Sequence, residues 1–162
     1  MTKRIHFADA VIKHVEPRAQ TNKDNFKPKG LWYSIEGNGD GWSDWCKSEN
    51  FEDTTQQVAH ELHINTNDIL CISTPEELDA FTKQFAYDPY KNARLKILRY
   101  IDWTRVANLW PGIEITPYLW SCRLDNRYFW YYSWDCASGC IWMPSDCDLK
   151  IVNVRRPIVC TG

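Results

Sequence analysis

The sequence lacks the motifs of several large enzyme classes. It contains no Walker A motif, no G-x-G-x-x-G, no G-x-S-x-G, no HExxH and no carboxylate pair typical of a catalytic dyad. Phosphate-loop enzymes, Rossmann oxidoreductases, α/β-hydrolases and zinc hydrolases are therefore not expected. A Cys-His hydrolase, with Cys136 or Cys140 beside His6 or His60, is arithmetically possible, but nothing in the local sequence supports it.

The chain also lacks long apolar runs and a strong charge of one sign. Residues 1–15 hold no apolar core long enough for a signal peptide, and no later run approaches membrane-spanning length. We therefore expect a cytoplasmic protein without a membrane segment. The formal net charge of −2 gives no general attraction to nucleic acid. Basic runs at residues 91–99 and 150–156 most often mean solvated surface, yet they leave a nucleic-acid substrate possible on one face.

The cysteines do not form the pattern of a disulfide framework or of a zinc site. There are seven, an odd number, which favours reduced thiols in a cytosol. Cys136, Cys140 and Cys147 cluster, but their C-x3-C-x6-C spacing lacks the paired C-x2-C of structural zinc sites. We expect no metal site.

Aromatic residues are abundant. The chain has 162 residues, of which 44% are hydrophobic and 14% aromatic, and it contains nine tryptophans. This length favours one core, and we expect a single domain over residues 1–162. Tryptophans at this density predict rigid stacking surfaces both in the core and at a binding cleft.

The densest chemistry lies in residues 127–144, RYFWYYSWDCASGCIWMP. Aromatic side chains have high strand propensity, and alternate residues of a strand point to opposite faces. One face of the predicted strand carries Tyr128, Trp130, Tyr132 and Trp134. The small, polar residues 135–139 then predict a loop before a second strand at residues 140–143, which places a carboxylate, a hydroxyl and two thiols at a pocket rim. The alternative, in which every ring is core, explains the rings but not Asp135.

The remaining chain predicts more strands than helices. The clearest local signal is a capping box, with Thr74 as N-cap, Pro75 at the first helical position and Glu77 closing the box. Helices are expected at residues 42–51, 75–86 and 101–110. Strands are expected at residues 4–7, 11–15, 30–35, 58–64, 69–73, 113–115, 149–154 and 158–160. This order predicts an α+β fold with a mainly antiparallel twisted sheet and two to three helices. His60 and His63 fall on opposite faces of a strand, so they are not expected to share a metal.

Four segments carry a resemblance: KPKGLW at residues 27–32, IDW at 101–103, GIEITPY at 112–118 and WDCASGCIW at 134–142. Over most of its length the chain resembles a group of short bacteriophage and prophage proteins with these segments. In its order of elements it is also similar to the ADP-ribosyltransferase superfamily. Those enzymes place a histidine or arginine on the first strand, a Gly-Leu-aromatic-x-Ser strand second, and an acidic residue on a later strand.

The second resemblance implies NAD as the cofactor and an ADP-ribosyltransferase-like fold. His6 would hydrogen-bond the adenosine ribose or the pyrophosphate, although a lone histidine on a strand is more often structural. Trp32 or Tyr33 would stack on nicotinamide, and Ser34 would contact the neighbouring ribose. Further candidate cofactor contacts on the aromatic segment and its loop are Tyr132 and Ser138.

The resemblance leaves two candidates for the catalytic acid, Asp135 and Glu114. The superfamily usually has a glutamate in an E/Q-x-E pair, and this sequence has no such pair. A carboxylate near the nicotinamide–ribose bond would stabilise the oxocarbenium-like centre that forms when the bond breaks. The implied activity is transfer of ADP-ribose to a macromolecular acceptor, a host protein or a nucleic acid.

Two other functions agree with the same residues. In one, the protein is a non-enzymatic inhibitor or binding module, and a tryptophan-rich cleft holds a nucleotide, a single-stranded base or a host protein. In the other, it is an interaction protein whose aromatic residues are all internal.

Overall fold

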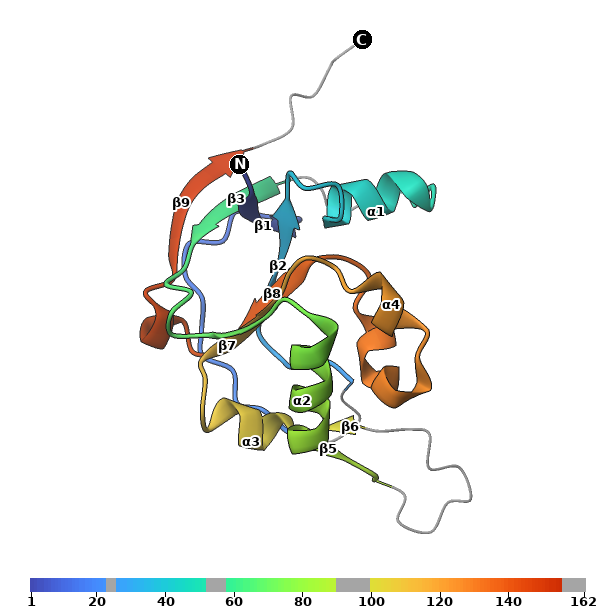
Figure 1. Ribbon diagram of the computed structural model, residues 1–162. Helices are drawn as coiled ribbons and strands as arrows, with labels where there is room; N and C mark the ends of the chain where they lie inside the picture. The colour runs from blue at the N-terminus through green and yellow to red at the C-terminus, as the bar shows by residue number, and fades with distance from the viewer. Residues whose placement is uncertain (23–25, 52–57, 90–99, 156–162) are drawn as a thin grey trace.

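Seven strands form one sheet in the computed structural model, which describes residues 1–22, 26–51, 58–89 and 100–155 (Figure 1). The order across the sheet is β4 (Leu70–Ile72), β7 (Gly112–Ile115), β8 (Ser138–Ile141), β2 (Leu31–Glu36), β1 (Lys3–Ala8), β3 (Val58–His63) and β9 (Lys150–Arg155). Neighbouring strands are antiparallel except β4 and β7, which are parallel. The sequence thus correctly predicted an α+β domain with a mainly antiparallel sheet.

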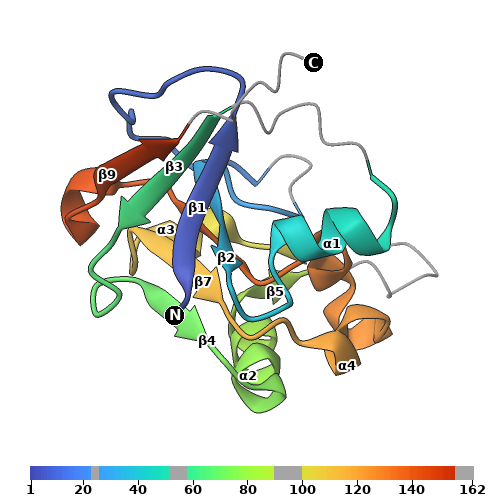
Figure 2. The same cartoon turned by 90° about the horizontal axis from the view of Figure 1, so that it is seen from above.

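Helices cover part of this sheet. They are α1 (Trp42–Ser48), α2 (Pro75–Phe85), α3 (Trp103–Ala107) and α4 (Trp120–Arg123), with the 3-10 helices η1 (Asn126–Ser133) and η2 (Pro144–Cys147). A two-stranded ladder joins β5 (Ala86–Tyr87) to β6 (Tyr100–Ile101). Figures 1 and 2 both show α1 and α4 on the same flank of the molecule, whereas α2, which directly follows β4 in the chain, lies on the side away from β9. Within the described ranges, no helix is long and apolar enough to cross a membrane.

Helix α2 begins and packs as its sequence predicts. The Thr74 side chain accepts a hydrogen bond from the Glu77 backbone N–H, and the Glu77 carboxylate accepts one from the Thr74 N–H. Pro75 occupies the first turn, where its missing N–H has no helical partner to lose. Leu78, Phe81 and Phe85 are all buried, so one stripe of the helix faces the core.

The prediction of a strand through the aromatic residues 128–134 is wrong, because this segment forms η1. The Asp125 carboxylate accepts a hydrogen bond from the Arg127 N–H and so starts the helix. Trp130 and Tyr131 are adjacent in sequence and both fully buried, which a strand with one solvated face would not allow. Strand propensity depends on the packing around a segment. Here Tyr128, Trp130 and Tyr131 are all buried, and a helix can direct their rings into the core from consecutive positions.

Other elements also differ from the sequence prediction. Residues 11–15 form no strand, and the helix expected at 101–110 is limited to α3. The described residues contain four α-helices and two 3-10 helices, more than the two to three expected. The predicted strand at residues 158–160 and the basic run at 91–99 lie outside the described residues.

The register divides the central sheet into two faces. Residues paired across neighbouring strands point to the same side. Ile5 pairs with Ser34, and Ser34 pairs with Ser138. We call their side the tryptophan face, because Trp32 also lies on it. The opposite side, the glutamate face, carries Arg4, His6, Tyr33, His60 and Glu114.

A buried hydrogen-bond network crosses the glutamate face from β1 to β7. Arg4 donates to both carboxylate oxygens of Glu114, from Nε at 2.7 Å and from a terminal nitrogen at 2.9 Å. The Tyr33 hydroxyl donates to the same carboxylate at 2.8 Å. Glu114 is only 3% exposed, so these three hydrogen bonds compensate for removing its charge from water. Burial and then the Glu114 charge raise the pKa of Tyr33 well above its ordinary value, which keeps the hydroxyl a donor.

Glu114→Ala is expected to reduce the free energy of unfolding by about 3 kcal/mol. This is the lower end of the cost of breaking a buried ion pair, because Arg4 keeps some access to water. Urea unfolding followed by tryptophan fluorescence measures the change. Glu49→Ala, at an exposed position after α1, is the matched control and should change stability by less than about 0.5 kcal/mol. Equal stability of the two variants would contradict a structural role for Glu114.

Candidate functional site

A cleft opens on the tryptophan face between the β1–β2 strands and α1. Its volume is about 250 Å³. The apolar part of its wall comes from five residues of four segments: Ile5, Phe7, Trp32, Trp42 and Trp134. The polar part comes from Lys27, Ser34, Asp135, Cys136 and Ser138. An apolar cleft with a few convergent polar groups is the usual form of a small-molecule site.

Hydrogen bonds from β2 bring Trp42 to the cleft. Gly41, the N-cap of α1, has no side chain to cap the helix. The Ser34 hydroxyl takes over this function, because it accepts a hydrogen bond from the Trp42 N–H at 2.7 Å and donates to Glu36 at 2.5 Å. The same Glu36 oxygen accepts from the Ser43 N–H at 3.2 Å. Residues 36–41 therefore fold α1 back against the strand that precedes it.

Trp32 and Trp134 meet at the other side of the cleft. Their rings are 4.8 Å apart in a T-shaped arrangement, and the Trp32 indole N–H donates to the Pro28 carbonyl at 3.2 Å. The Lys27 ammonium lies 5.2 Å from the centre of the Trp32 ring, within the range of a cation–π interaction. Burial lowers the pKa of Lys27, while the nearby Asp135 partly opposes this effect.

Asp135 is the carboxylate of the cleft. Its side chain is 31% exposed and one oxygen lies 3.4 Å from a terminal nitrogen of Arg123, so the contact is long and the group retains access to solvent. The backbone just before it is held by the Tyr118 hydroxyl, which donates to the Trp134 carbonyl. Ser138 is less available to a ligand, because its hydroxyl donates to the Cys136 carbonyl at 3.0 Å.

The structure brings most of the predicted site residues to one place. The cleft lining includes His6, Trp32, Tyr33, Ser34, Asp135 and Ser138. Two of them have side chains bound to groups elsewhere. The His6 Nδ1–H donates to the Trp32 carbonyl at 2.6 Å and its ring packs 5.7 Å from the His60 ring on the glutamate face, so its side chain is directed away from a ligand on the tryptophan face. The Tyr33 hydroxyl is bound to Glu114, which prevents this ring from turning to stack in the cleft.

Glu114 and Tyr132 are not part of the cleft lining. Glu114 lies on the opposite face of the sheet and is bound by Arg4 and Tyr33, which removes it as an alternative acid for this site. Tyr132 is 50% exposed and follows the course of η1. The expected strand would have placed it beside Trp134 on one face, whereas the helix turns it outward.

The cleft residues that the sequence did not single out as candidates include Lys27 and Trp42. Lys27 precedes the Pro28 that leads into β2. A cation next to a strand with two aromatic residues is the sequence signal that could have identified it as a cleft residue. The sequence predicts Trp42 on a helix, but no sequence pattern indicates that the Ser34 hydroxyl binds its N–H.

Neither Cys136, which lines the cleft, nor Cys140 on β8 is an activated nucleophile. Burial raises the pKa of Cys136 to about 12 and the pKa of Cys140 well above its ordinary value. Neither His6 nor His60 makes a hydrogen bond with them; His60 Nε2 instead accepts the Ile12 N–H at 2.9 Å. Among the described residues, no group of three or more His, Cys, Asp or Glu side chains is placed to hold a metal ion.

Comparison with known proteins gives no match: no family model, no curated protein sequence and no solved structure is detectably similar to the chain.

Cys136 is expected to resist alkylation in the folded protein. With a pKa of about 12, only about one Cys136 in ten thousand is a thiolate at pH 8. The thiolate population rises with pH and becomes substantial only near pH 12. Iodoacetamide at pH 8, followed by peptide mass spectrometry, should modify the exposed Cys71 and leave Cys136 intact, while both should react in urea. Rapid modification of Cys136 in the folded protein would restore it as a candidate nucleophile.

Proposed function

We propose that the protein binds a nucleotide by enclosing one planar ring in the tryptophan-lined cleft. The observation that carries this proposal is the arrangement of Trp32, Trp42 and Trp134 around one opening with Lys27 and Asp135 at its edge. Indole rings stack on any base or on nicotinamide, and this interaction contributes roughly 1–3 kcal/mol per ring.

The size of the cleft favours a single ring with its sugar. Pockets for drug-sized ligands usually have about 300–1,000 Å³, and the cleft has about 250 Å³. A dinucleotide would therefore place one half in the cleft and the other along the surface outside it. Among the cleft residues, Lys27 supplies a positive charge for phosphate and Asp135 an acceptor for ribose hydroxyls.

A second candidate function is the ADP-ribosyl transfer that the sequence resemblance implies, with NAD as cofactor. The presence of Asp135 at the edge of the same cleft favours it. With nicotinamide between the tryptophans, the bond between its nitrogen and ribose C1′ would break, and nicotinamide would leave with the electron pair. The Asp135 carboxylate would stabilise the positive charge at C1′ and accept the proton of the acceptor hydroxyl or amine that forms the new bond. An ADP-ribosyltransferase-like fold is part of this proposal.

Trp42→Ala is expected to weaken nucleotide binding about 5- to 100-fold, because the cleft loses one stacking wall. The measurement is quenching of intrinsic tryptophan fluorescence by AMP, thymidine monophosphate and NAD, with isothermal calorimetry to confirm affinity. Leu109→Ala is the control, because this apolar side chain is 58% exposed and does not line the cleft. Equal affinities of native protein and both variants, at unchanged thermal stability, would refute binding in the cleft.

Asp135→Asn tests the second candidate. If the protein cleaves NAD, the variant should bind NAD within a few-fold of the native affinity and release nicotinamide at least about 100-fold more slowly, because the neutral amide cannot stabilise the positive centre. Nicotinamide is quantified by chromatography. The control is Asp146→Asn, which changes an exposed carboxylate outside the cleft. Absence of nicotinamide release by the native protein would dismiss transfer and leave the binding proposal standing.

A further inference from the structure

Two exposed aromatic residues lie just outside the cleft. Trp120, at the start of α4, is 61% exposed and Tyr132, near the end of η1, is 50% exposed. Both rings contact the guanidinium of Arg123, which is 6.0 Å from the Trp120 ring and 5.5 Å from the Tyr132 ring. We call Trp120 and Tyr132 the outer aromatic pair. The Tyr132 ring also stacks on Phe129, with ring centres 6.4 Å apart. Tyr, Trp and Arg are the residue types most enriched at binding surfaces.

The outer aromatic pair is connected to the cleft by direct contacts. Arg123, which lies against both rings, also reaches the cleft carboxylate Asp135 at 3.4 Å. Tyr118 packs edge-on against Trp120 with ring centres 4.7 Å apart, and its hydroxyl donates to the carbonyl of the cleft residue Trp134. The segment of residues 118–135 thus carries the outer aromatic pair and one wall of the cleft.

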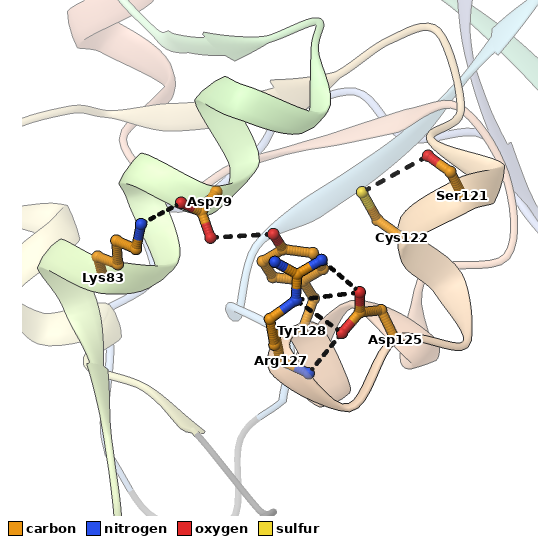
Figure 3. Close-up of polar contacts among 7 residues, drawn as sticks. All are labelled: Asp79, Lys83, Ser121, Cys122, Asp125, Arg127 and Tyr128. Atoms are coloured by element: carbon orange, nitrogen blue, oxygen red, sulfur yellow. Dashed lines mark hydrogen bonds and ion pairs between the residues drawn. The ribbon is translucent and has the colours of Figure 1, made fainter.

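Polar contacts fix this segment on α2, as Figure 3 shows. The Tyr128 hydroxyl donates to Asp79 at 2.9 Å, and Asp79 also pairs with Lys83 one turn further along α2. Arg127 binds Asp125 through two nitrogens, at 3.1 and 2.7 Å, at the start of η1. The Trp130 indole N–H also donates to the Thr82 hydroxyl of α2 at 3.0 Å. Because the segment is bonded to α2 through Tyr128 and Trp130, the outer rings are held in place before a ligand arrives, which lowers the entropic cost of binding.

Charge and ring order together indicate the kind of ligand. Along the path from the cleft outward, the ammonium of Lys27 lies against Trp32 and the guanidinium of Arg123 lies between the outer rings. Rings that alternate with cations match a single strand, whose bases stack on aromatic side chains and whose phosphates pair with Lys and Arg. A duplex does not fit, because its base faces are covered by neighbouring base pairs.

We propose that the outer aromatic pair extends the cleft into a track for single-stranded nucleic acid, with one base in the cleft and the next base on Trp120 or Tyr132. This inference rests on the proposed function, because the first base occupies the proposed nucleotide site. The contact is short, so the formal charge of −2 on the whole chain does not oppose it strongly.

The test compares a 5′-fluorescein-labelled hexathymidylate with thymidine monophosphate. Fluorescence anisotropy should show that the oligonucleotide binds the native protein at least about tenfold more tightly than the nucleotide. The variant Trp120→Ala/Tyr132→Ala should lose about 5- to 100-fold in oligonucleotide affinity and keep the native affinity for thymidine monophosphate. Leu109→Ala, which removes another exposed apolar side chain, is the control and should change neither affinity.

Salt and strandedness give independent readouts. With phosphate contacts to Lys27 and Arg123, the logarithm of the association constant should fall with the logarithm of the salt concentration with a slope of about −1.4. A labelled duplex of the same sequence should bind more weakly than the single strand. Oligonucleotide affinity equal to that of the nucleotide, or unaffected by the double variant, would overturn the inference and favour a protein as the partner of the outer pair. That result would leave nucleotide binding in the cleft intact, whereas Trp42→Ala tests the cleft alone.

Discussion

The buried carboxylate of Glu114 constrains the rest of the structure. A negative charge that is only 3% exposed is stable only if its oxygens are bound, and here Arg4 from β1 and Tyr33 from β2 provide the donors. The network therefore links strands that are distant in sequence. The network also depends on β8, which lies between β2 and β7. A Cβ atom on Gly139 of β8 would lie 2.3 Å from the Tyr33 hydroxyl, so only glycine lets the Tyr33 side chain reach Glu114.

This network also decides which side chains reach the cleft. Because Tyr33 turns toward Glu114, its neighbours Trp32 and Ser34 must point to the opposite face of β2. Trp32 becomes a wall of the cleft, and Ser34 caps α1 and so positions Trp42. The alternation of side chains along β2 therefore determines both the buried network and the wall of the cleft. The acid that rivals Asp135 in the sequence stabilises the sheet instead, which leaves Asp135 as the carboxylate that lines the cleft.

Local rules predicted the elements whose interactions are local. Thr74, Pro75 and Glu77 specify the start of α2 within four residues, and the alternation of side chains in β3 leaves His60 buried and His63 exposed, in agreement with the expected opposite faces. The aromatic segment shows the limit of these rules. Its ring density indicated a strand, but the hydrogen bonds of Tyr128 to Asp79 and of Trp130 to Thr82 come from α2, almost fifty residues earlier, and they suit a 3-10 helix.

The sequence alone determined the fold class, the capped helix and the short list from which the candidate site is drawn, because composition, alternation and capping act between near neighbours. The tertiary structure decided which of those candidates share a cleft. Lys27, Trp42 and Asp135 line one cleft because contacts join residues that are far apart in the chain. A contact of the same kind, from Arg4, holds Glu114 on the opposite face of the sheet. The energy of a buried charge depends on every group around it, and only the folded chain brings those groups together.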